Sequence, residues 1–149
     1  MKSCHHMDVK DIYIDAITSI GPDLYTNEQI HAWSSLACLP KVFDRLLIEG
    51  KGWISFENEV VAAFALRHPI NRLALLYCRG KFSRQGHASS LLHRIEIDAY
   101  KENQSSITTE ASFFSYKLLL KKNWHIIGTE NIEIGGVPFQ RYRMFKHLI

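Results

Sequence analysis

Apolar residues recur at helical spacing through the first third of the chain. Asp8 stands where it can cap a first helix that ends at Gly21-Pro22-Asp23. Thr26-Asn27-Glu28-Gln29 has the pattern of a capping box ahead of a second helix. Pro40 opens a third, shorter helical piece that runs to Glu49. This part of the chain is therefore predicted to be helical.

The apolar pattern then changes to that of strands. The expected elements, in order, are strands Trp53–Glu57, Val60–Arg67 and Leu73–Arg79, a helix from Gln85 to Glu102, a strand Ser106–Glu110, a helix Phe113–Lys122, and a hairpin of Trp124–Ile134 with Val137–Lys146 around Gly135-Gly136. The order α-α-β-β-β-α-β-α-β-β predicts an α/β domain. No repeat, low-complexity tract or linker divides it.

Composition narrows the class of protein. The chain has 149 residues, of which 46% are hydrophobic, so residues 1–149 are expected to form one domain with a substantial core. Its three cysteines are odd in number and far apart, which favours reduced thiols in a cytoplasmic protein. The longest apolar run, Val60–Leu66, is too short to cross a membrane, and no secretory leader pattern is visible.

The charge pattern draws attention to Leu75–Ile95. There a predicted strand enters a basic, glycine-containing loop that opens directly into a helix. Between Val60 and Ile95 the chain has six Arg or Lys and no Asp or Glu, although its net charge is only +3. Backbone N–H groups at such a loop and helix start suit a phosphate or pyrophosphate.

Several other chemistries find no support in the sequence. The loop lacks the GxxxxGK pattern of P-loop proteins and the GxGxxG pattern of dinucleotide-binding folds, and no GxSxG elbow is present. Cys4-His5-His6 has no second ligand pair at a recognised spacing, so no metal site is predicted.

The stretch Ser83–Ala88 resembles the acyl-CoA-binding signature Q/R-x-x-G-x-G/A of the GNAT acetyltransferase superfamily. Leu75–Cys78 stands where that family has its fourth strand, at the fitting distance from the glycine. Tyr25–Trp33, Thr109–Ser112 (TEAS) and Arg143–Lys146 are similar to segments of one bacterial branch. The resemblance covers nearly the whole chain in order.

This resemblance implies a single N-acetyltransferase domain over residues 1–149, with a mixed, mostly antiparallel, strongly twisted sheet flanked by helices. It implies acetyl-CoA as co-substrate, no metal, and direct transfer of an acetyl group to an amine of a small molecule or a protein. Such a reaction requires an oriented thioester, a deprotonated amine and a proton donor for the departing thiolate.

The resemblance also assigns the coenzyme site residue by residue. Backbone groups of the fourth strand would pair with the pantetheine arm, amides of the loop would hold the pyrophosphate, and a serine after the fifth strand would approach the arm. The residues concerned are Leu76, Tyr77, Cys78, Arg84, Gln85, Gly86, His87, Ala88, Ser89 and Ser112. Gly86 would let the backbone approach the pyrophosphate closely.

Three positions depart from the family pattern. Ser83 replaces the first Gln or Arg of the signature, and His87 replaces an aliphatic residue. Leu119 stands where many members have a tyrosine that acts as general acid, and leucine has no proton to donate. The candidate catalytic residues are therefore Tyr116 as a substitute acid, Glu110 as acceptor of the amine proton through water, and Tyr77 in either role.

Two other functions stay open. Leu119 suggests a non-catalytic domain that binds or senses CoA, and the basic segment suggests an RNA-associated acetyltransferase. The second is ranked lowest because the segment lacks interleaved aromatic residues. The expected partners are an amine acceptor and a second copy of the chain in a homodimer, with neither a membrane nor nucleic acid. Met1–Met7 leaves room for a short strand before the first helix.

Overall fold

The computed structural model describes residues 1–148, with Pro40 described by its backbone alone. The N-terminal third is helical, as predicted. It comprises α1 (His6–Ile20), α2 (Asn27–Ser34) and α3 (Arg45–Glu49), with short 3₁₀ turns at Ser3–His5, Gly21–Asp23 and Ser35–Cys38 and a π turn at Pro40–Asp44.

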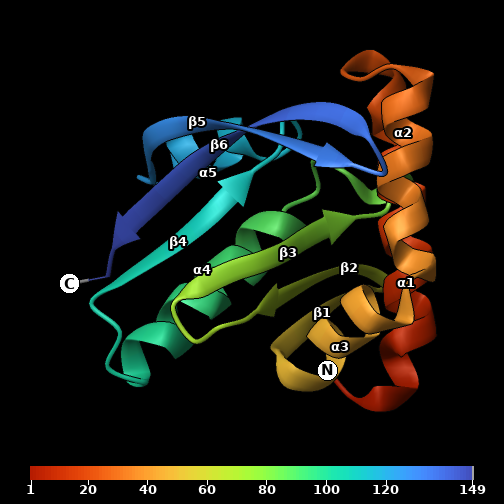
Figure 1. Cartoon of the computed structure of the whole chain (residues 1–149). Helices are drawn as coiled ribbons and strands as arrows, with labels where there is room; N and C mark the ends of the chain where they lie inside the picture. Colours follow the sequence, from red (N-terminus) through yellow and green to blue (C-terminus); the bar gives the residue numbers. More distant parts are fainter. Residues whose placement is uncertain (149) are drawn as a thin grey trace.

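The rest of the chain builds a six-stranded sheet (Figure 1). Its elements are β1 (Lys51–Glu57), β2 (Val60–Arg67), β3 (Arg72–Cys78), α4 (His87–Lys101), β4 (Ser106–Ala111), α5 (Tyr116–Lys121), β5 (His125–Ile134) and β6 (Val137–His147). The strand order is β1-β2-β3-β4-β6-β5, and every neighbouring pair is antiparallel except β3 with β4. The mixed, mostly antiparallel sheet is thus confirmed.

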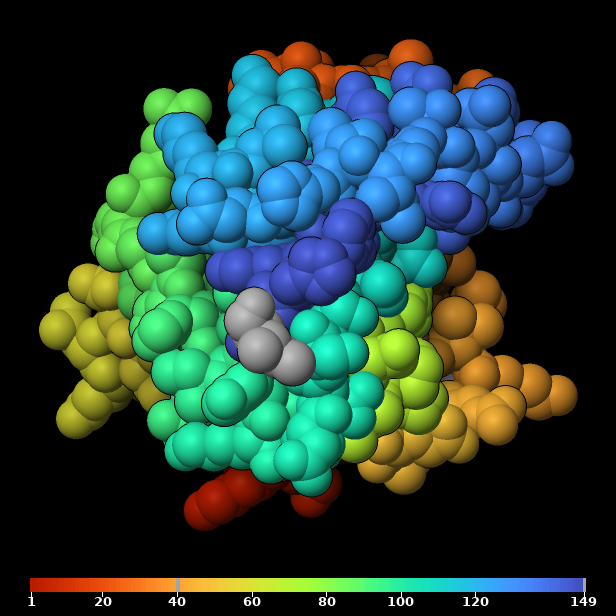
Figure 2. Space-filling view, turned by 90° about the vertical axis from the view of Figure 1, so that its left-hand side faces the viewer, coloured from red at the N-terminus to blue at the C-terminus, as the bar shows by residue number. Residues whose placement is uncertain are grey.

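The sheet lies between α1 and α2 on one side and α4 on the other. In Figure 1, α4 lies behind the strands, and α1 and α2 stand along one end of the sheet. Figure 2 shows the opposite end, where β5 and β6 (blue and violet) lie side by side above the blue-green turn that joins α4 to β4.

The expectation of a short strand before the first helix is wrong. Ser3–His5 is a 3₁₀ turn that runs directly into α1, and the backbone N–H of Lys2 donates to Nδ1 of His5 at 3.1 Å. The amino group of Met1 donates to the carbonyl of Gly52 at 2.9 Å, which is its one contact with β1 among the hydrogen bonds described. Asp8 lies inside the first turn of α1, where its charge suits the helix dipole, rather than at the cap.

The capping box at α2 is confirmed. The backbone N–H of Gln29 donates to Oγ1 of Thr26 at 3.2 Å, and the N–H of Thr26 donates to Oε1 of Gln29 at 3.0 Å. The Gln29 amide also donates to the carbonyl of Pro138 at 3.0 Å, which attaches the start of α2 to β6.

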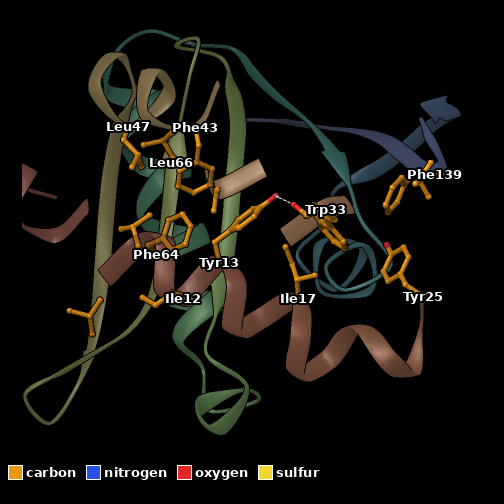
Figure 3. Packing of buried hydrophobic residues seen from close by; sticks show 14 residues of the cluster. Ile12, Tyr13, Ile17, Tyr25, Trp33, Phe43, Leu47, Phe64, Leu66 and Phe139 are labelled. Atoms are coloured by element: carbon orange, nitrogen blue, oxygen red, sulfur yellow. Dashed lines mark hydrogen bonds between the residues drawn. The ribbon is translucent and has the colours of Figure 1, made fainter. Parts of the chain in front are cut away.

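One core lies between α1, α2 and one face of β2 and β3 (Figure 3). Ile12, Ile17 and Phe64 are fully buried there. The Tyr13 hydroxyl donates to the carbonyl of Trp33 at 3.0 Å, joining α1 to α2. Burial raises the pKa of Tyr13 far above its ordinary value, so the hydroxyl keeps its proton and remains a donor.

A second core lies under α4. Its helix residues Leu91, Leu92 and Ile95 pack against alanines of β2 and against Ile107 and Met144. Since both faces of β2 are covered, residues Val61–Arg67 are all buried. This explains why the strand reads as a nearly continuous apolar run rather than as an alternating pattern.

Arg67 is the one charged residue in this buried run, and it ties β2 to α4. Its side chain is 1% exposed, and Nη2 donates to Asp98 at 2.5 Å and to Glu102 at 2.9 Å. Lys51 of β1 contacts the same two carboxylates at 2.8 and 2.9 Å. The hydrogen bonds from Lys51 and Arg67 lower the pKa of Glu102 from 4.5 to about 2.

This lowered pKa predicts an acid-sensitive contribution to stability. The folded state favours the charged form of Glu102, so the contribution is complete above pH 4.5 and is lost as the pH falls toward 2. Urea unfolding across this range should show a shallower pH dependence for Glu102→Gln than for the unmodified chain. Glu59→Gln, at an exposed position in the turn between β1 and β2, should keep the original slope. Equal slopes for all three proteins would contradict the prediction.

Candidate functional site

The sheet opens between its two parallel strands. β3 and β4 pair only at Arg72 with Thr108 and at Leu73 with Thr109. At the second of these pairs the Thr109 hydroxyl donates a hydrogen bond to the carbonyl of Leu73 at 2.7 Å. The C-terminal halves of the two strands then diverge.

This divergence leaves backbone groups of β3 facing the opening. On its other edge β3 pairs with β2, and the Arg79 N–H donates to the carbonyl of Ala62 at 2.9 Å. In an antiparallel pair only alternate residues direct both backbone groups at the partner strand. The register from Arg79 back through Tyr77 therefore turns the N–H and C=O of Leu76 and Cys78 away from β2 and into the opening.

A large cleft of about 1580 Å³ extends from this opening along the loop before α4 and the N-terminal end of α5. Most of the predicted coenzyme residues line it: Leu76, Tyr77, Cys78, Arg84, Gly86, His87, Ala88 and Ser89. Gln85 does not, because its side chain donates back to the carbonyl of Lys81 at 3.3 Å. Ser112 lines a different, smaller cavity.

The loop conformation exposes the start of α4. Arg84 and Gly86 have positive φ angles of 62° and 91°. Gly86 is the N-cap residue of α4, and no side chain caps the first N–H groups of the helix. These N–H groups lie at the cleft wall and form the positive end of the helix dipole. Asp15 of α1 attaches the loop to the helix, because its carboxylate accepts a hydrogen bond from the Gly80 N–H at 2.8 Å.

Positive side chains outnumber negative ones along the cleft. The lining contains Lys81, Arg84, Lys117 and Lys121, with Asp23 as the one carboxylate among the lining residues described. The sequence pattern attributes the positive charge at the loop to the basic residues between Val60 and Ile95, and the structure corrects this. Three of the six basic residues between Val60 and Ile95 are used inside the fold, where Arg67 pairs with Asp98, Arg72 pairs with Glu110, and Arg79 donates to the carbonyl of Val61. Two lysines of α5 replace them at the cleft.

A second cavity, of about 300 Å³, lies on the α1–α2 side of the same opening. Its polar lining includes Arg72, Glu110, Gln140 and Arg141, and its walls are aromatic and aliphatic side chains from α1, α2, the π turn and the β5–β6 hairpin. The two cavities share Leu76, Tyr77 and Ser115, so they meet at the end of β3.

The three candidate catalytic residues lie at different places in this pair of cavities. Glu110 lines the small cavity, Tyr77 lines both, and Tyr116 lines the large cleft, where its ring lies 4.8 Å from that of Tyr142. Burial raises the pKa of Tyr77 well above its ordinary value. Ser115, which sequence reasoning missed, also lies where the cavities meet. A signal existed, because Ser115 precedes Leu119 by one helical turn.

Comparison with solved structures identifies the architecture. A GCN5-related N-acetyltransferase (aminotransferase, class II) from Rhodopseudomonas palustris superposes with a TM-score of 0.94 at 20% identity, covering 99% of this chain and 92% of that one. The PaiA N-acetyltransferase from Thermoplasma acidophilum, in complex with coenzyme A, gives 0.76 at 11% identity, covering 99% and 95%. An N-acetyltransferase from Staphylococcus aureus gives 0.68 at 19%, covering 100% and 96%. The chain has the GNAT fold.

At the level of sequence, by contrast, neither a family model nor a curated protein matches this chain. The structural matches share at most 20% identity among the three described, so they establish the GNAT fold and leave the activity to be argued from the site.

Within this GNAT fold, His87 anchors the loop to the sheet. Its Nδ1 lies 2.6 Å from the Ser55 hydroxyl and its Nε2 lies 2.7 Å from the Glu57 carboxylate, both on β1. The ring is 8% exposed and lies edge-on to Phe82 of the loop. The aliphatic residue expected here is therefore replaced by a polar link between α4 and β1.

Three further observations concern the Cys78 thiol, groups that could bind a metal, and helices that could cross a membrane. Desolvation raises the pKa of the Cys78 thiol to about 11, so the thiol stays protonated at neutral pH and is a weak nucleophile. No group of three or more His, Cys, Asp or Glu side chains that could hold a metal ion occurs within residues 1–148. Nor does that part of the chain contain a helix with the length and apolar character needed to cross a bilayer.

Removing the His87 ring should weaken the attachment of the loop. His87→Ala deletes two partly buried hydrogen bonds and the packing on Phe82, so we expect the free energy of unfolding to fall by about 1–3 kcal/mol. His93→Ala, at an exposed position of the same helix, should change it by less than about 0.5 kcal/mol. Urea unfolding of both variants measures the difference, and equal stabilities would show that His87 is not an anchor.

Proposed function

We propose that this chain is an acetyl-CoA-dependent N-acyltransferase that transfers an acetyl group directly to an amine, and that residues 1–149 form one catalytic domain. The observation that carries the proposal is the meeting of two cavities at Leu76, Tyr77 and Ser115. One cavity suits a long anionic ligand and the other suits a small acceptor. A direct transfer needs its two substrates in contact at one point.

The large cleft would hold the coenzyme. The loop from Arg84 to Ser89 and the uncapped start of α4 present N–H groups to a pyrophosphate, with Lys81 and Arg84 adding positive charge. The backbone groups of Leu76 and Cys78 that face the opening would pair with the amides of the pantetheine arm. Coenzyme A in the Thermoplasma PaiA structure, which shares this fold, supports the assignment.

The reacting groups would lie where the cavities meet. The Leu76 N–H, which faces the opening near Cys78 where the cavities meet, would donate a hydrogen bond to the thioester carbonyl and so stabilise the negative charge that develops on its oxygen. The amine nitrogen forms a bond to the acetyl carbon while the carbon–sulfur bond breaks. The nitrogen gives up one proton, and the departing sulfur takes one up as the free thiol.

Glu110 would accept the proton of the amine. Its carboxylate lines the small cavity, and Nε of Arg72 donates to it at 2.9 Å, which fixes its position at the base of the opening. The proton would then pass from Glu110 through a water molecule to bulk solvent.

The proton donor to the sulfur would be a hydroxyl near the end of β3. Leu119 belongs to the core under α4 and also lines the small cavity, where its side chain has no proton to donate. The raised pKa of Tyr77 makes that hydroxyl a poor acid, although it can still donate a hydrogen bond. Ser115 and Tyr116 remain, one where the cavities meet and the other beside the coenzyme cleft.

A non-catalytic CoA-binding domain is the second candidate, and Leu119 is the observation that favours it. Both functions require coenzyme binding, and only the first requires the small cavity to take an amine. Release of free thiol from acetyl-CoA in the presence of a panel of primary amines separates them. Tight binding without any thiol release would favour the sensor.

The coenzyme site can be tested at Gly86. Gly86→Val forces a branched residue into a φ of 91° at the loop that would hold the pyrophosphate, so we expect the affinity for CoA to fall at least tenfold by calorimetric titration. Gly136→Val is the matched control, because Gly136 has a φ of 80° and equally open surroundings in the β5–β6 turn. It should cost similar stability and leave the affinity for CoA unchanged. Equal affinities in the two variants would refute the loop assignment.

The proton donor can be tested by two hydroxyl deletions. Ser115→Ala and Tyr116→Phe should each leave the affinity for CoA within about twofold, and the variant that lacks the donor should lose about 10²- to 10⁴-fold in kcat. The position of Ser115 at both cavities predicts the larger loss there. Unchanged kcat in both variants would mean that neither hydroxyl donates and that water protonates the sulfur.

A further inference from the structure

We infer that the acceptor is a free amino acid with a large apolar side chain, and that the guanidinium of Arg141 binds its carboxylate in the small cavity. This inference rests on the proposed N-acyltransferase function and adds a substrate class to it. Three independent features of the cavity carry it: the sign of its charge, an unsatisfied donor in its wall, and the character of its remaining surface.

The charge of the cavity disfavours a polycationic acceptor. Its ionisable lining consists of Arg72, Arg141 and Glu110, together with tyrosines whose hydroxyls keep their protons. Arg72 is paired with Glu110, and Arg141 is paired with Glu130 of β5, which lies outside the lining. A polyamine, an aminoglycoside or a lysine-rich peptide would bring several positive charges to a lining with two guanidiniums and one carboxylate, and that carboxylate is already paired.

Arg141 has unused hydrogen-bonding capacity. Its Nη2 donates to Glu130 of β5 at 2.8 Å, and Glu130 does not line the cavity. Its Nε is buried without an acceptor, one of three such side-chain nitrogens in the described residues together with Arg67 Nε and Trp124 Nε1. Of the three residues, Arg141 is the one that lines either cavity. A guanidinium with free donors beside a ligand cavity suits a carboxylate, which accepts two parallel hydrogen bonds from it.

Arg72 is less available for the same role. Its Nε donates to Glu110 at 2.9 Å and its Nη1 donates to the carbonyl of His68 at 3.1 Å. These two bonds hold the side chain at the base of the opening. Arg72 therefore orients Glu110, whereas Arg141 is left to contact the acceptor.

The sheet register sets Arg141 and Glu110 on the same face. Glu110 pairs with Arg143, and Ala111 pairs with Tyr142. Paired residues share a face and alternate along each strand, so Arg141 follows Arg143 on the face that carries Glu110. Both side chains line the small cavity. An amine held beside Glu110 and a carboxylate held by Arg141 would orient one small molecule at both ends.

The rest of the cavity surface is apolar and largely aromatic. Tyr25 and Trp33 lie 5.2 Å apart between ring centroids, and Phe139 lies 6.0 and 6.1 Å from them (Figure 3). Leu36, Val42 and Ile132 extend this wall. A volume of about 300 Å³ is at the small end of the range for ligand pockets and matches a single amino acid better than a peptide or a protein surface.

The test compares each amino acid with the amine that lacks its carboxylate. L-leucine with isoamylamine and L-phenylalanine with phenethylamine are offered to the full chain with acetyl-CoA, and thiol release is measured. We expect kcat/KM to be about 10- to 100-fold higher for the amino acid of each pair. Arg141→Gln should reduce the ratio of the two kcat/KM values in each pair to about one, while the affinity for CoA stays within about threefold of the unmodified chain.

The matched control is Arg143→Gln, at an exposed arginine two residues further along β6 that lines neither cavity. It should keep the preference for the amino acid. A binding measurement accompanies the kinetics: with CoA present, L-leucine or L-phenylalanine should raise the melting temperature of the chain, and the corresponding amine should not. In Arg141→Gln this difference should disappear.

The outcomes separate failure of this inference from failure of the proposed function. If CoA binds but the simple amines react as well as the amino acids, or if Arg141→Gln lowers both rates equally, the carboxylate assignment is wrong and the acyltransferase stands. If CoA binds and neither class of compound reacts or raises the melting temperature, the substrate class is wrong. If CoA itself does not bind, the proposed function fails and the inference fails with it.

Discussion

The parting of β3 from β4 is the constraint on which both cavities depend. A parallel pair inside a sheet would normally continue its ladder, since unpaired backbone groups are costly when buried. Here the ladder ends after two registered pairs, and the Thr109 hydroxyl takes the carbonyl of Leu73. The Arg72–Glu110 ion pair spans the strands at the same level. Polar side chains thus replace further backbone rungs, and the exposed edge of β3 is left available to a ligand.

The two sides of this opening differ in ways that follow from the layers of the fold. On one side lie the start of α4 and the lysines of α5, which make the large cleft positive and rich in free N–H groups. On the other side lie aromatic residues of α1 and α2. Without the opening, they would form a continuous core around Tyr13, Trp33 and Phe139. One break in one pair of strands therefore gives an anion-binding cleft and an aromatic cavity that touch.

Local sequence patterns predicted most of the fold, and contacts between distant residues account for what they missed. The capping box at Thr26 depends on a few adjacent residues, so a sequence reveals it. The partners of the basic residues do not: Arg67 reaches Asp98 and Glu102 of α4, 31 and 35 residues away, and Arg72 reaches Glu110, 38 residues away. Counting charges along the chain therefore overstated the charge at the loop. Arg141 went unnoticed for the same reason, because its importance comes from a cavity whose lining residues range from Tyr13 to Arg141 along the chain.

Leu119, at the position where the family resemblance places a tyrosine, packs in the core and also lines the small cavity. Leu119 is buried under α4 with Leu91 and Trp124, where a hydroxyl would need a partner to offset its desolvation. The backbone N–H of Leu119 donates to the carbonyl of Ser115 at 3.1 Å, so the two residues are one helical turn apart and share a face of α5. That face meets the junction of the two cavities at Ser115. In the proposed mechanism, the Ser115 hydroxyl, one turn earlier and lining both cavities, would protonate the departing thiolate in place of a tyrosine.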